Sequence, residues 1–330
     1  MADYPSNDVL PYHVPVLLDE TLIFLAPVPG AAILDATLGG GGHSAAIAER
    51  ISPGGTIFGL DHDLEAIAAA RKRLHGFSEI TTTLLHTGFG ELNAVLAALD
   101  GGETIRFDGA IFDLGVSSHQ LDTARGFSFR RDEPLDMRLD GSDTSRPTAA
   151  AFLASADEKE IARVLWEFGD EKWSRRIARR MVDRRTKGER LETTQQLATL
   201  IEQSIPRGAW PREIHVATRS FQALRIAVND ELGQLRSGLK ATMERMAPGG
   251  RLVVISYHSL EDRIVKQLFA AWAGRTPSAP GSSPAALMPS LAPSAIATLL
   301  TRKPVIPTDD EVARNPRSRS AKLRALVRDS

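Results

Sequence analysis

Cysteine is absent from this sequence of 330 residues, and long apolar runs are absent as well. Without cysteine the protein forms no disulfide bond and no cysteine-ligated zinc site, a composition typical of the reducing cytoplasm. No apolar run approaches the length of a transmembrane helix, and the N-terminus lacks the basic start and apolar centre of a signal peptide. We therefore expect a cytoplasmic protein with no membrane partner.

An excess of charge of one sign is also missing, because 40 Lys and Arg residues face 41 Asp and Glu residues. With a net charge of −1, any affinity for nucleic acid must come from local basic patches. The hydrophobic fraction of 42% and the charged fraction of 25% are those of a globular protein. The length allows one large domain or two domains of moderate size.

The most informative stretch is a glycine-rich turn. A short apolar run ends at Asp35, the glycines Gly39–Gly42 follow, and His43 precedes the helix-like residues 44–51. A strand that turns on glycines into a helix brings backbone N–H groups and the positive end of the helix dipole close to a ligand. Glycine is expected there because a Cβ would block this approach and because several positions need a positive φ.

A second strand is expected at residues 55–61, and its last residue, Asp61, suits a carboxylate that grips the hydroxyls of an adenosine ribose. The glycines alone could form an ordinary flexible turn, but the flanking strands favour a nucleoside-binding βαβ unit. A nicotinamide dinucleotide and S-adenosylmethionine are both open as cofactors. The acid Asp35 is unfavourable beside a pyrophosphate and favourable beside a sulfonium and an ammonium, so the turn favours the methyl donor.

Strands and helices then alternate. We expect strands at 82–85 and 107–113 and helices at 64–74, capped by Asp63, and at 92–99. This alternation predicts a parallel sheet whose ligand lies at the carboxyl ends of the strands. Four residues are expected at that edge: Asp35, Asp61, Phe89 and Asp113.

The pattern becomes helical between about Leu121 and His215. Ser155 with Glu158, and Thr193 with Gln196, are predicted capping boxes. The apolar stripes that follow or lie between them are interpreted as core packing. They comprise Ile161, Val164, Leu165 and Phe168, then Trp173, Ile177 and Met181, then Leu197, Leu200 and Ile201. These residues predict a small inserted helical domain.

Within this domain residues 172–190 contain nine basic side chains, with a dense run at Arg175, Arg176, Arg179 and Arg180. RNA contact and an ordinary solvated helix face are both consistent with this run. A second basic segment near the C-terminus includes Arg317, Arg319 and Lys322. We expect these seven residues to contact RNA.

The sheet is expected to resume after the insertion. One long helix with an apolar face from Phe221 to Met243 ends at Pro248-Gly249-Gly250, a fifth strand covers 251–256, and a helix begins at Tyr257. A stretch rich in proline, serine and alanine, 276–294, is expected to form a mobile loop. The final two strands are expected within 298–308 and 320–328.

Several long motifs resemble one family over nearly the whole chain, the ribosomal RNA small-subunit methyltransferase H family of the MraW type. They are His13–Glu20, Asp35–His43, Asp113–Ser118, Arg125–Phe129, Pro134–Arg138, Thr218–Ile226 and Ile255–Arg263. The resemblance implies transfer of a methyl group from S-adenosylmethionine to the N4 amine of a cytidine in the decoding region of 16S rRNA. The partner it implies is 16S rRNA within the small ribosomal subunit.

The fold implied is α/β, a class I (Rossmann-like) methyltransferase with an inserted helical domain. We expect the core to comprise 1–120 and 217–330 and the inserted substrate-recognition domain to comprise 121–216. The resemblance assigns cofactor binding to Gly41, Gly42, His43, Asp61, Phe89, Asp113 and Gln120, and we add Gly40 from the same turn. Gly40 departs from the family, where some relatives have arginine.

The chemistry suggests further roles. Many amino-methyltransferases place an Asp/Asn-Pro-Pro-aromatic motif after the fourth strand, whereas this chain has Asp113-Leu-Gly-Val116. Base stacking must then come from Tyr257 or Phe127. Asp113 is the expected polar contact of the reacting amine, although cofactor binding is open as its main role.

His258 either accepts a proton or caps its helix. We thus name Asp113, Tyr257 and His258 as catalytic and expect no metal site. Two alternatives are a nicotinamide-dependent oxidoreductase, which Asp35 argues against, and a non-catalytic RNA-binding assembly factor, which the intact glycine turn and Asp61 argue against. The oligomeric state is open, with a homodimer as one option.

Overall fold

A computed structural model describes residues 15–115, 125–275 and 295–330. Gln120, the motif residue His13 and the stretch 276–294 lie outside the described residues. Internal contacts divide the chain into two compact units, unit 1 (Met1–Gly115 and Gln234–Ser330) and unit 2 (Val116–Gly233). Unit 2 includes residues 217–233, which we had assigned to the second part of the core.

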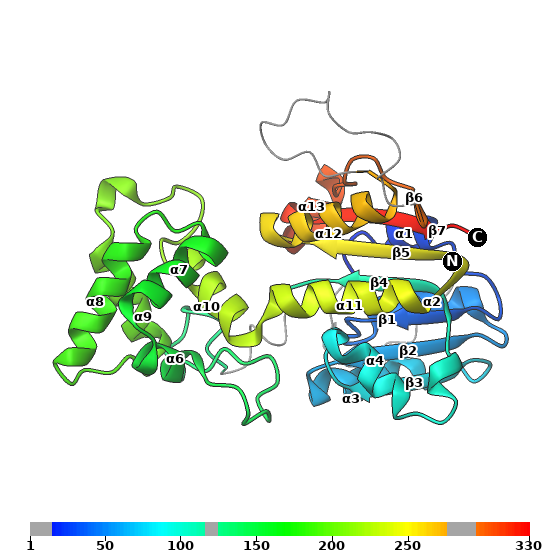
Figure 1. Ribbon diagram of the computed structural model, residues 1–330, viewed down its shortest axis with the longest axis horizontal. Coiled ribbons are helices and arrows are strands. Elements are labelled where there is room, and N and C mark those ends of the chain that lie inside the picture. Colours follow the sequence, from blue (N-terminus) through cyan, green and yellow to red (C-terminus); the bar gives the residue numbers. More distant parts are fainter. Residues whose placement is uncertain (1–14, 116–124, 276–294) are drawn as a thin grey trace. The chain divides into compact units, whose positions relative to one another are not determined.

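Unit 1 is built on a seven-stranded sheet in the order β3-β2-β1-β4-β5-β7-β6 (Figure 1). Its strands are β1 (Ala32–Asp35), β2 (Thr56–Asp61), β3 (Thr81–His86), β4 (Phe107–Asp113), β5 (Met246–Ser256), β6 (Ala297–Leu299) and β7 (Lys322–Arg328). The strands from β3 to β5 pair in parallel, and β7 pairs antiparallel with both β5 and β6. The predicted α/β fold with a parallel sheet is therefore confirmed, as are the two final strands.

The helices of unit 1 follow the strands as the alternation predicted. They are α1 (Leu18–Leu25), α2 (Gly42–Ile51), α3 (Leu64–Leu74), α4 (Leu92–Ala97), α11 (Glu231–Arg245, from Gln234 on), α12 (Ser259–Trp272) and α13 (Asp309–Arg314). Asp63 caps α3 by accepting a hydrogen bond from the backbone of Glu65. One buried cluster joins α1 and α2 to the central strands through residues such as Leu25, Ile47 and Ile111. In Figure 1, α11 and α12 lie in front of the sheet.

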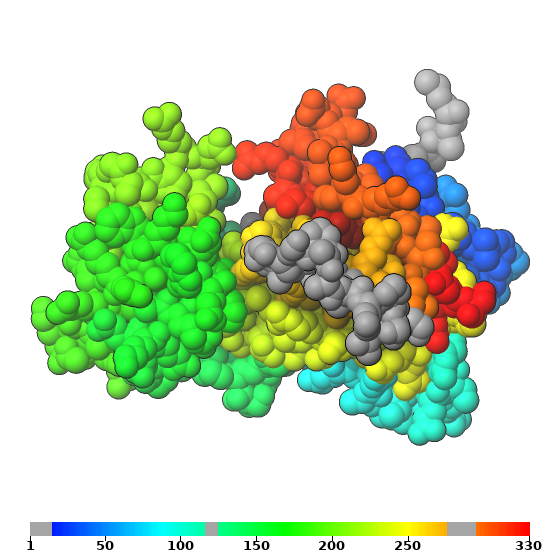
Figure 2. Space-filling view, turned by 45° about the horizontal axis from the view of Figure 1, so that its top comes forward, coloured from blue at the N-terminus to red at the C-terminus, as the bar shows by residue number. Residues whose placement is uncertain are grey.

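Unit 2 is helical, with α6 (Ala149–Ser155), α7 (Glu158–Gly169), α8 (Ser174–Thr186), α9 (Thr194–Ser204) and α10 (Thr218–Asn229). The three predicted apolar stripes all enter its core, which contains Ile161, Ile177 and Leu197 at 0% exposure. Figure 2 shows this unit as the closely packed green part of the surface. The stripes are core packing, as predicted.

Of the two capping boxes predicted in unit 2, one is confirmed and one is wrong. Thr193 and Gln196 form the predicted capping box of α9. The box predicted at Ser155 and Glu158 is wrong, because Ser155 ends α6 and Asp157 caps α7 by accepting a hydrogen bond of 2.7 Å from the backbone of Glu160. Asp is as good an N-cap as Ser, and here it stands two residues nearer to the helix.

The single helix predicted from Phe221 to Met243 is also wrong, because α10 and α11 are separated at Asp230, whose φ is +48°. Side-chain contacts stabilise this break between the two helices. The side-chain amide of Asn229 donates to the carbonyl of Met137 at 2.7 Å, and Arg225 makes two hydrogen bonds with Glu231. An apolar stripe that continues in phase on both sides does not reveal such a break.

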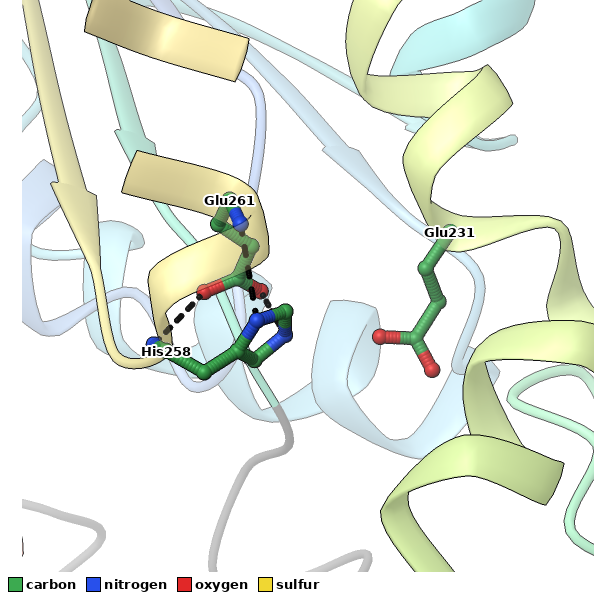
Figure 3. Close-up of side chains that lie close together, drawn as sticks. All are labelled: Glu231, His258 and Glu261. Carbon is green, nitrogen blue, oxygen red and sulfur yellow. Dashed lines mark hydrogen bonds and ion pairs between the residues drawn. The ribbon is translucent and has the colours of Figure 1, made fainter. Parts of the chain in front are cut away.

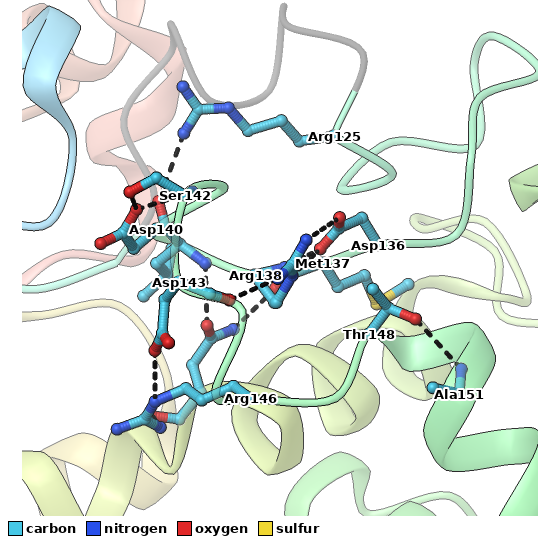
Figure 4. A network of polar contacts seen from close by, with 12 residues as sticks. Arg125, Asp136, Met137, Arg138, Asp140, Ser142, Asp143, Arg146, Thr148 and Ala151 are labelled. Atoms are coloured by element: carbon cyan, nitrogen blue, oxygen red, sulfur yellow. Dashed lines mark hydrogen bonds and ion pairs between the residues drawn. The ribbon is translucent and has the colours of Figure 1, made fainter.

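The motif Pro134–Arg138 has a structural role in unit 2 (Figure 4). Arg138 donates two hydrogen bonds to the carboxylate of Asp136, at 2.7 and 2.8 Å, and another to the carbonyl of Asp143. The backbone of Leu139 donates to the side chain of Asn229 at 2.8 Å. These bonds fasten the segment after the motif to the end of α10.

None of the helices in the described parts of the chain has the length and hydropathy needed to cross a membrane.

Candidate active site at the carboxyl edge of the sheet

Three acids end neighbouring strands of unit 1. Asp35 ends β1, Asp61 ends β2 and Asp113 ends β4. Because β1 pairs in parallel with β2 and with β4, these ends meet at the same edge of the sheet. This edge is where the alternation predicted the ligand.

The buried Asp35 stabilises the glycine turn through hydrogen bonds. It is 2% exposed, and its carboxylate accepts hydrogen bonds from the hydroxyl of Ser44 at 2.6 Å and from the backbone of Thr37 at 3.2 Å. Burial raises the pKa of Asp35 in spite of these donors. Asp35 is thus enclosed by its own loop.

Two glycines of the turn, Gly39 and Gly41, have the predicted positive φ, and Gly41 and Gly42 also allow close packing. Gly41, the N-cap of α2, has a φ of +74°, and a Cβ added to it would lie 3.1 Å from Ala70. A Cβ on Gly42 would lie 2.7 Å from the ring of Pro15. Because these two glycines have no side chain, α2 begins in close contact with α3 and with Pro15. The N–H groups and the positive dipole end at the N-terminus of α2 therefore face the carboxyl edge of the sheet.

Asp61 is held in place by two backbone N–H groups. Oδ2 accepts from Gly39 at 2.8 Å, and Oδ1 accepts from Asp63 at 2.9 Å. Burial nevertheless raises the pKa of Asp61 to about 6. Each carboxylate oxygen can accept a second hydrogen bond, so the side chain can still bind the two hydroxyls of a ribose.

Asp113 lies between two side chains from other elements. Its Oδ1 accepts a hydrogen bond of 2.7 Å from the hydroxyl of Tyr257, and its Oδ2 lies 3.5 Å from Nε2 of His43. The backbone N–H of Asp113 donates to the hydroxyl of Thr37 at 2.6 Å. The side chain of Asp113 is 24% exposed, so its carboxylate can still reach a bound molecule.

Tyr257 follows β5, and contacts of both its hydroxyl and its ring hold the side chain in place. Its hydroxyl binds Asp113, and its ring lies against Gly115, where an added Cβ would be 3.3 Å from the ring. Burial, followed by the nearby Asp113, raises the pKa of Tyr257 well above its usual value. The phenol therefore stays neutral and donates its proton in a hydrogen bond.

His258 caps helix α12 (Figure 3). Its Nδ1 accepts from the backbone of Glu261 at 3.4 Å, while the Glu261 carboxylate accepts from the backbone of Tyr257 at 2.9 Å. Nε2 of His258 lies 3.1 Å from Glu261. Of the two roles considered for His258, the structure shows the cap. Glu231, also drawn in Figure 3, belongs to unit 2, where it pairs with Arg225.

Phe89 lies beyond the end of β3, packed edge-to-face on Phe112 with ring centroids 5.5 Å apart. Helix α11 reaches it at Gly238, where a Cβ would lie 2.8 Å from the Phe89 ring. Phe127, the other ring considered for base stacking, is 8% exposed within the core of unit 2. It is therefore not available to stack on a base.

The basic residues predicted to contact RNA fall on both units. Arg175, Arg176 and Arg179 are exposed on α8, whereas Arg180 donates to the carbonyl of Gln203 at 2.6 Å. In unit 1, Arg317 and Arg319 are exposed on a short 3₁₀ helix, and Lys322 is partly buried at the start of β7. Arg180 is thus tied to α9, while Arg175, Arg176 and Arg179 face solvent.

The edge fits a nucleoside-containing cofactor. Within the described residues, Nδ1 of His43 is buried without a hydrogen bond beside the N-terminus of α2, and its Nε2 faces the carboxylate of Asp113 at 3.5 Å. Asp61 and Asp113 keep unused acceptor capacity at the same edge. S-adenosylmethionine offers hydroxyl, ammonium and carboxylate groups that would fit such partners, and the N-terminus of a helix such as α2 favours an anionic group.

Two positioning residues escaped the sequence prediction. Thr37, within the motif Asp35–His43, holds Asp113, and Ser44, the residue just after that motif, holds Asp35. Their positions on either side of the glycines were the available signal. The exposure of a third residue, Trp166 on α7, was also not predicted. Trp166 is 55% exposed, and its position off the apolar stripe of α7 was a signal that it would face solvent.

Comparison with known proteins identifies the family of this chain. The sequence profile of the MraW methylase family matches residues 11–329. A ribosomal RNA small subunit methyltransferase H from Pelobacter propionicus is 47% identical over 319 residues, covering 95% of this chain and 97% of that protein. Its namesake from Geobacter sulfurreducens is 49% identical over 321 residues, covering 95% and 97%. The chain therefore belongs to the MraW methylase family, with the class I methyltransferase fold and the S-adenosylmethionine cofactor that were predicted from its sequence.

Proposed function

We propose that this protein transfers the methyl group of S-adenosylmethionine to the N4 amine of a cytidine in the decoding region of 16S rRNA, within the small ribosomal subunit. The observation that carries the proposal is the identity of 47–49% over nearly the whole chain to proteins named ribosomal RNA small subunit methyltransferase H. Such similarity covers both units, so it includes the parts that would bind RNA as well as those that would bind the cofactor.

The cofactor is assigned to the carboxyl edge of unit 1. Asp61 would bind the ribose, and the turn with its helix N-terminus would receive the amino-acid part of the cofactor. The proposed contacts are Gly40, Gly41, Gly42, His43, Asp61, Phe89, Asp113 and Gln120, of which Gln120 lies outside the described residues. When bound, S-adenosylmethionine supplies an electrophilic methyl group on a positively charged sulfur.

Asp113 is proposed to orient the cytosine amine. The lone pair of this amine is delocalised into the ring, so catalysis depends on aiming it at the methyl group. A carboxylate that accepts a hydrogen bond from the amine helps the nitrogen to become pyramidal and to lose a proton after transfer. The hydrogen bond from Tyr257 at 2.7 Å holds Asp113 in one rotamer and leaves its second oxygen to accept from a substrate.

The roles of the neighbouring side chains differ in kind. Tyr257 touches Asp113 directly and, with its proton retained, acts as a donor rather than a base. His258 remains a proposed proton acceptor, but its contacts within the capping box of α12 favour a positioning role. The basic residues proposed to bind RNA phosphates are Arg175, Arg176, Arg179 and Arg180 of α8 and Arg317, Arg319 and Lys322 near the C-terminus. A homodimer stays a prediction that sedimentation of the purified protein would test.

The proposal can be tested with purified protein and S-adenosylmethionine that carries a labelled methyl group. Small subunits, large subunits and naked 16S rRNA are offered as substrates, and nucleosides from the digested RNA are separated against standards. Because N4-methylcytidine and 5-methylcytidine have the same mass, retention time and fragmentation identify the product. Asp113→Asn serves as the matched variant, since it keeps the shape of the side chain.

One N4-methylcytidine in the decoding region of small-subunit RNA is the expected product. A methyl group on another base, on the cytosine ring carbon or on large-subunit RNA would contradict the proposal. Because the substrate is a structured region, subunits are expected to be methylated faster than naked RNA.

A further inference from the structure

Helices α7 and α8 of unit 2 enclose a groove of ≈ 620 Å³. One side is formed by α7 from Glu158 to Trp166, and the other by the start of α8 and the residues just before it. This volume lies within the range of about 300–1,000 Å³ that is typical of sites for small organic molecules. We refer to it as the α7–α8 groove.

The groove is strongly basic. Five cations line it against a single acid, Glu158, on a chain whose net charge is −1. The cations are Lys159, Arg163, Lys172, Arg175 and Arg176. Arg163 is engaged by an ion pair of 2.8 Å with Glu167, in which both side chains are about half exposed. The other four cations of the groove are exposed, so anionic groups can approach them.

Two indole rings accompany these charges. Trp166 is 55% exposed, so a large part of its indole ring is open to a ligand in the groove. Trp173 packs partly on the core of unit 2, and the guanidinium of Arg176 lies 5.8 Å from the centre of its ring. The groove thus offers one open aromatic face and one aromatic ring already paired with arginine.

We propose that the α7–α8 groove binds an unpaired nucleotide of the RNA substrate, with its base stacked on Trp166 and its phosphates beside Lys172, Arg175 and Arg176. Aromatic platforms next to a basic track are what single-stranded nucleic acid requires, and paired bases cannot use such a platform. An acidic protein segment would satisfy the cations but would have no need of the open indole. The identification of the ligand as RNA rests on the proposed function.

This assignment divides the basic residues of α8 into groups. Arg175 and Arg176 line the groove, Arg179 is exposed outside its lining, and Arg180 is bound to Gln203. Substitution of Arg176 should therefore weaken RNA binding, whereas a charge change at exposed Arg190, also in unit 2, should have little effect.

The direct test measures binding of a fluorescein-labelled, ten-nucleotide single-stranded RNA of mixed sequence to the full chain by anisotropy. Trp166→Ala is expected to weaken binding by about 5- to 150-fold, the equivalent of about 1–3 kcal/mol at 1.4 kcal/mol per tenfold change. Trp166→Phe keeps a stacking ring and should restore most of the affinity. Ile214→Ala, at another exposed apolar residue of unit 2, is the matched control and should bind normally.

Charge is tested separately. Arg176→Glu should weaken binding and lower the dependence of log affinity on log salt by at least about 0.7, the value for one phosphate contact on a single strand. Arg190→Glu should leave both quantities near those of the unmodified protein. A duplex of the same sequence should bind more weakly than the single strand and should be insensitive to Trp166→Ala.

The outcomes distinguish this inference from the proposed function. If the unmodified protein methylates subunits as proposed, but Trp166→Ala and Arg176→Glu bind single-stranded RNA as tightly as it does, the groove assignment is wrong and the proposed function stands. If the variants lose affinity for subunits but not for the oligonucleotide or naked rRNA, the groove binds a protein and the inference is overturned. Weakened oligonucleotide binding with a raised KM for subunits and unchanged kcat supports it.

Discussion

The hydroxyl of Tyr257 donates a hydrogen bond of 2.7 Å to Asp113, although the two residues are 144 positions apart. The pairing arises because β4 and β5 are neighbours in register, with Asp113 opposite Ile255. Tyr257 stands just beyond the end of β5, so its side chain reaches back to the acid. The contact fixes the carboxylate that we propose to meet the reacting amine.

Removing this hydroxyl should reduce turnover. In Tyr257→Phe the ring remains against Gly115 but Asp113 loses its donor, so kcat should fall by about 10- to 100-fold, as for loss of a hydrogen bond to a charged group. Tyr257→Ala should additionally raise KM if the ring also contacts the target base. Steady-state kinetics with small subunits and labelled cofactor provide the measurement. Equal kcat in Tyr257→Phe and the unmodified enzyme would mean that the hydroxyl has no part in catalysis.

Asp113→Asn should separate catalysis from cofactor binding. The amide keeps the shape of the side chain but loses the charge that assists the amine, so turnover should fall more than cofactor affinity. Single-turnover rates and calorimetric titration with S-adenosylmethionine give the two quantities. Equal losses in both would assign Asp113 to cofactor binding alone.

Asp61 should make cofactor binding dependent on pH. Its pKa is raised to about 6 by burial, so in the cofactor-free protein the carboxyl takes up a proton as the pH falls below about 6. If only the ionised form grips the ribose, affinity for S-adenosylmethionine should be constant above that pH and fall by about tenfold per unit below it. Calorimetric titrations from pH 5 to pH 7 measure this.

Two variants serve as controls for Asp61. Asp61→Ala should weaken cofactor binding by about 10- to 100-fold at pH 7, since charge-assisted hydrogen bonds are lost. Asp61→Asn should bind weakly at every pH and show no dependence between pH 5 and pH 7. An unchanged pH dependence in Asp61→Asn would show that another group is responsible.

The network around Arg138 should matter for the stability of unit 2. The side chain of Arg138 is 14% exposed and makes two hydrogen bonds with Asp136, so Arg138→Ala should lower the free energy of unfolding by about 1–3 kcal/mol. Arg163→Ala is the matched control, because its ion pair with Glu167 is half exposed and should contribute about 0–1 kcal/mol. Denaturant titrations compare the two. Equal effects would contradict the structural role assigned to this motif.

The parallel sheet and its acidic edge could be predicted because they depend on local patterns. Each of β1, β2 and β4 ends at an acid that the sequence places directly after an apolar run, as observed at Asp35, Asp61 and Asp113. The capping box of Thr193 was equally local and is confirmed. Residues that act within three or four positions of one another leave a readable signal.

The features that were missed depend on distant parts of the chain. The break at Asp230 is held by Asn229 reaching Met137, 92 positions away, and no helical stripe records such a contact. The hydrogen bond from Ser44 to the buried Asp35 could not be predicted from the motif. The packing of Gly42 against Pro15 likewise needs the folded turn to be seen.

The most direct test of the central claim uses a strain that lacks the gene for this protein. Ribosomal RNA from that strain is digested and mapped by mass spectrometry, alongside RNA from strains complemented with the unmodified gene or with Asp113→Asn. One N4-methylcytidine in the decoding region of 16S rRNA should be missing in the deletion strain, return with the unmodified gene, and return little or not at all with Asp113→Asn. Normal N4-methylation of that region in the deletion strain would contradict the proposed function.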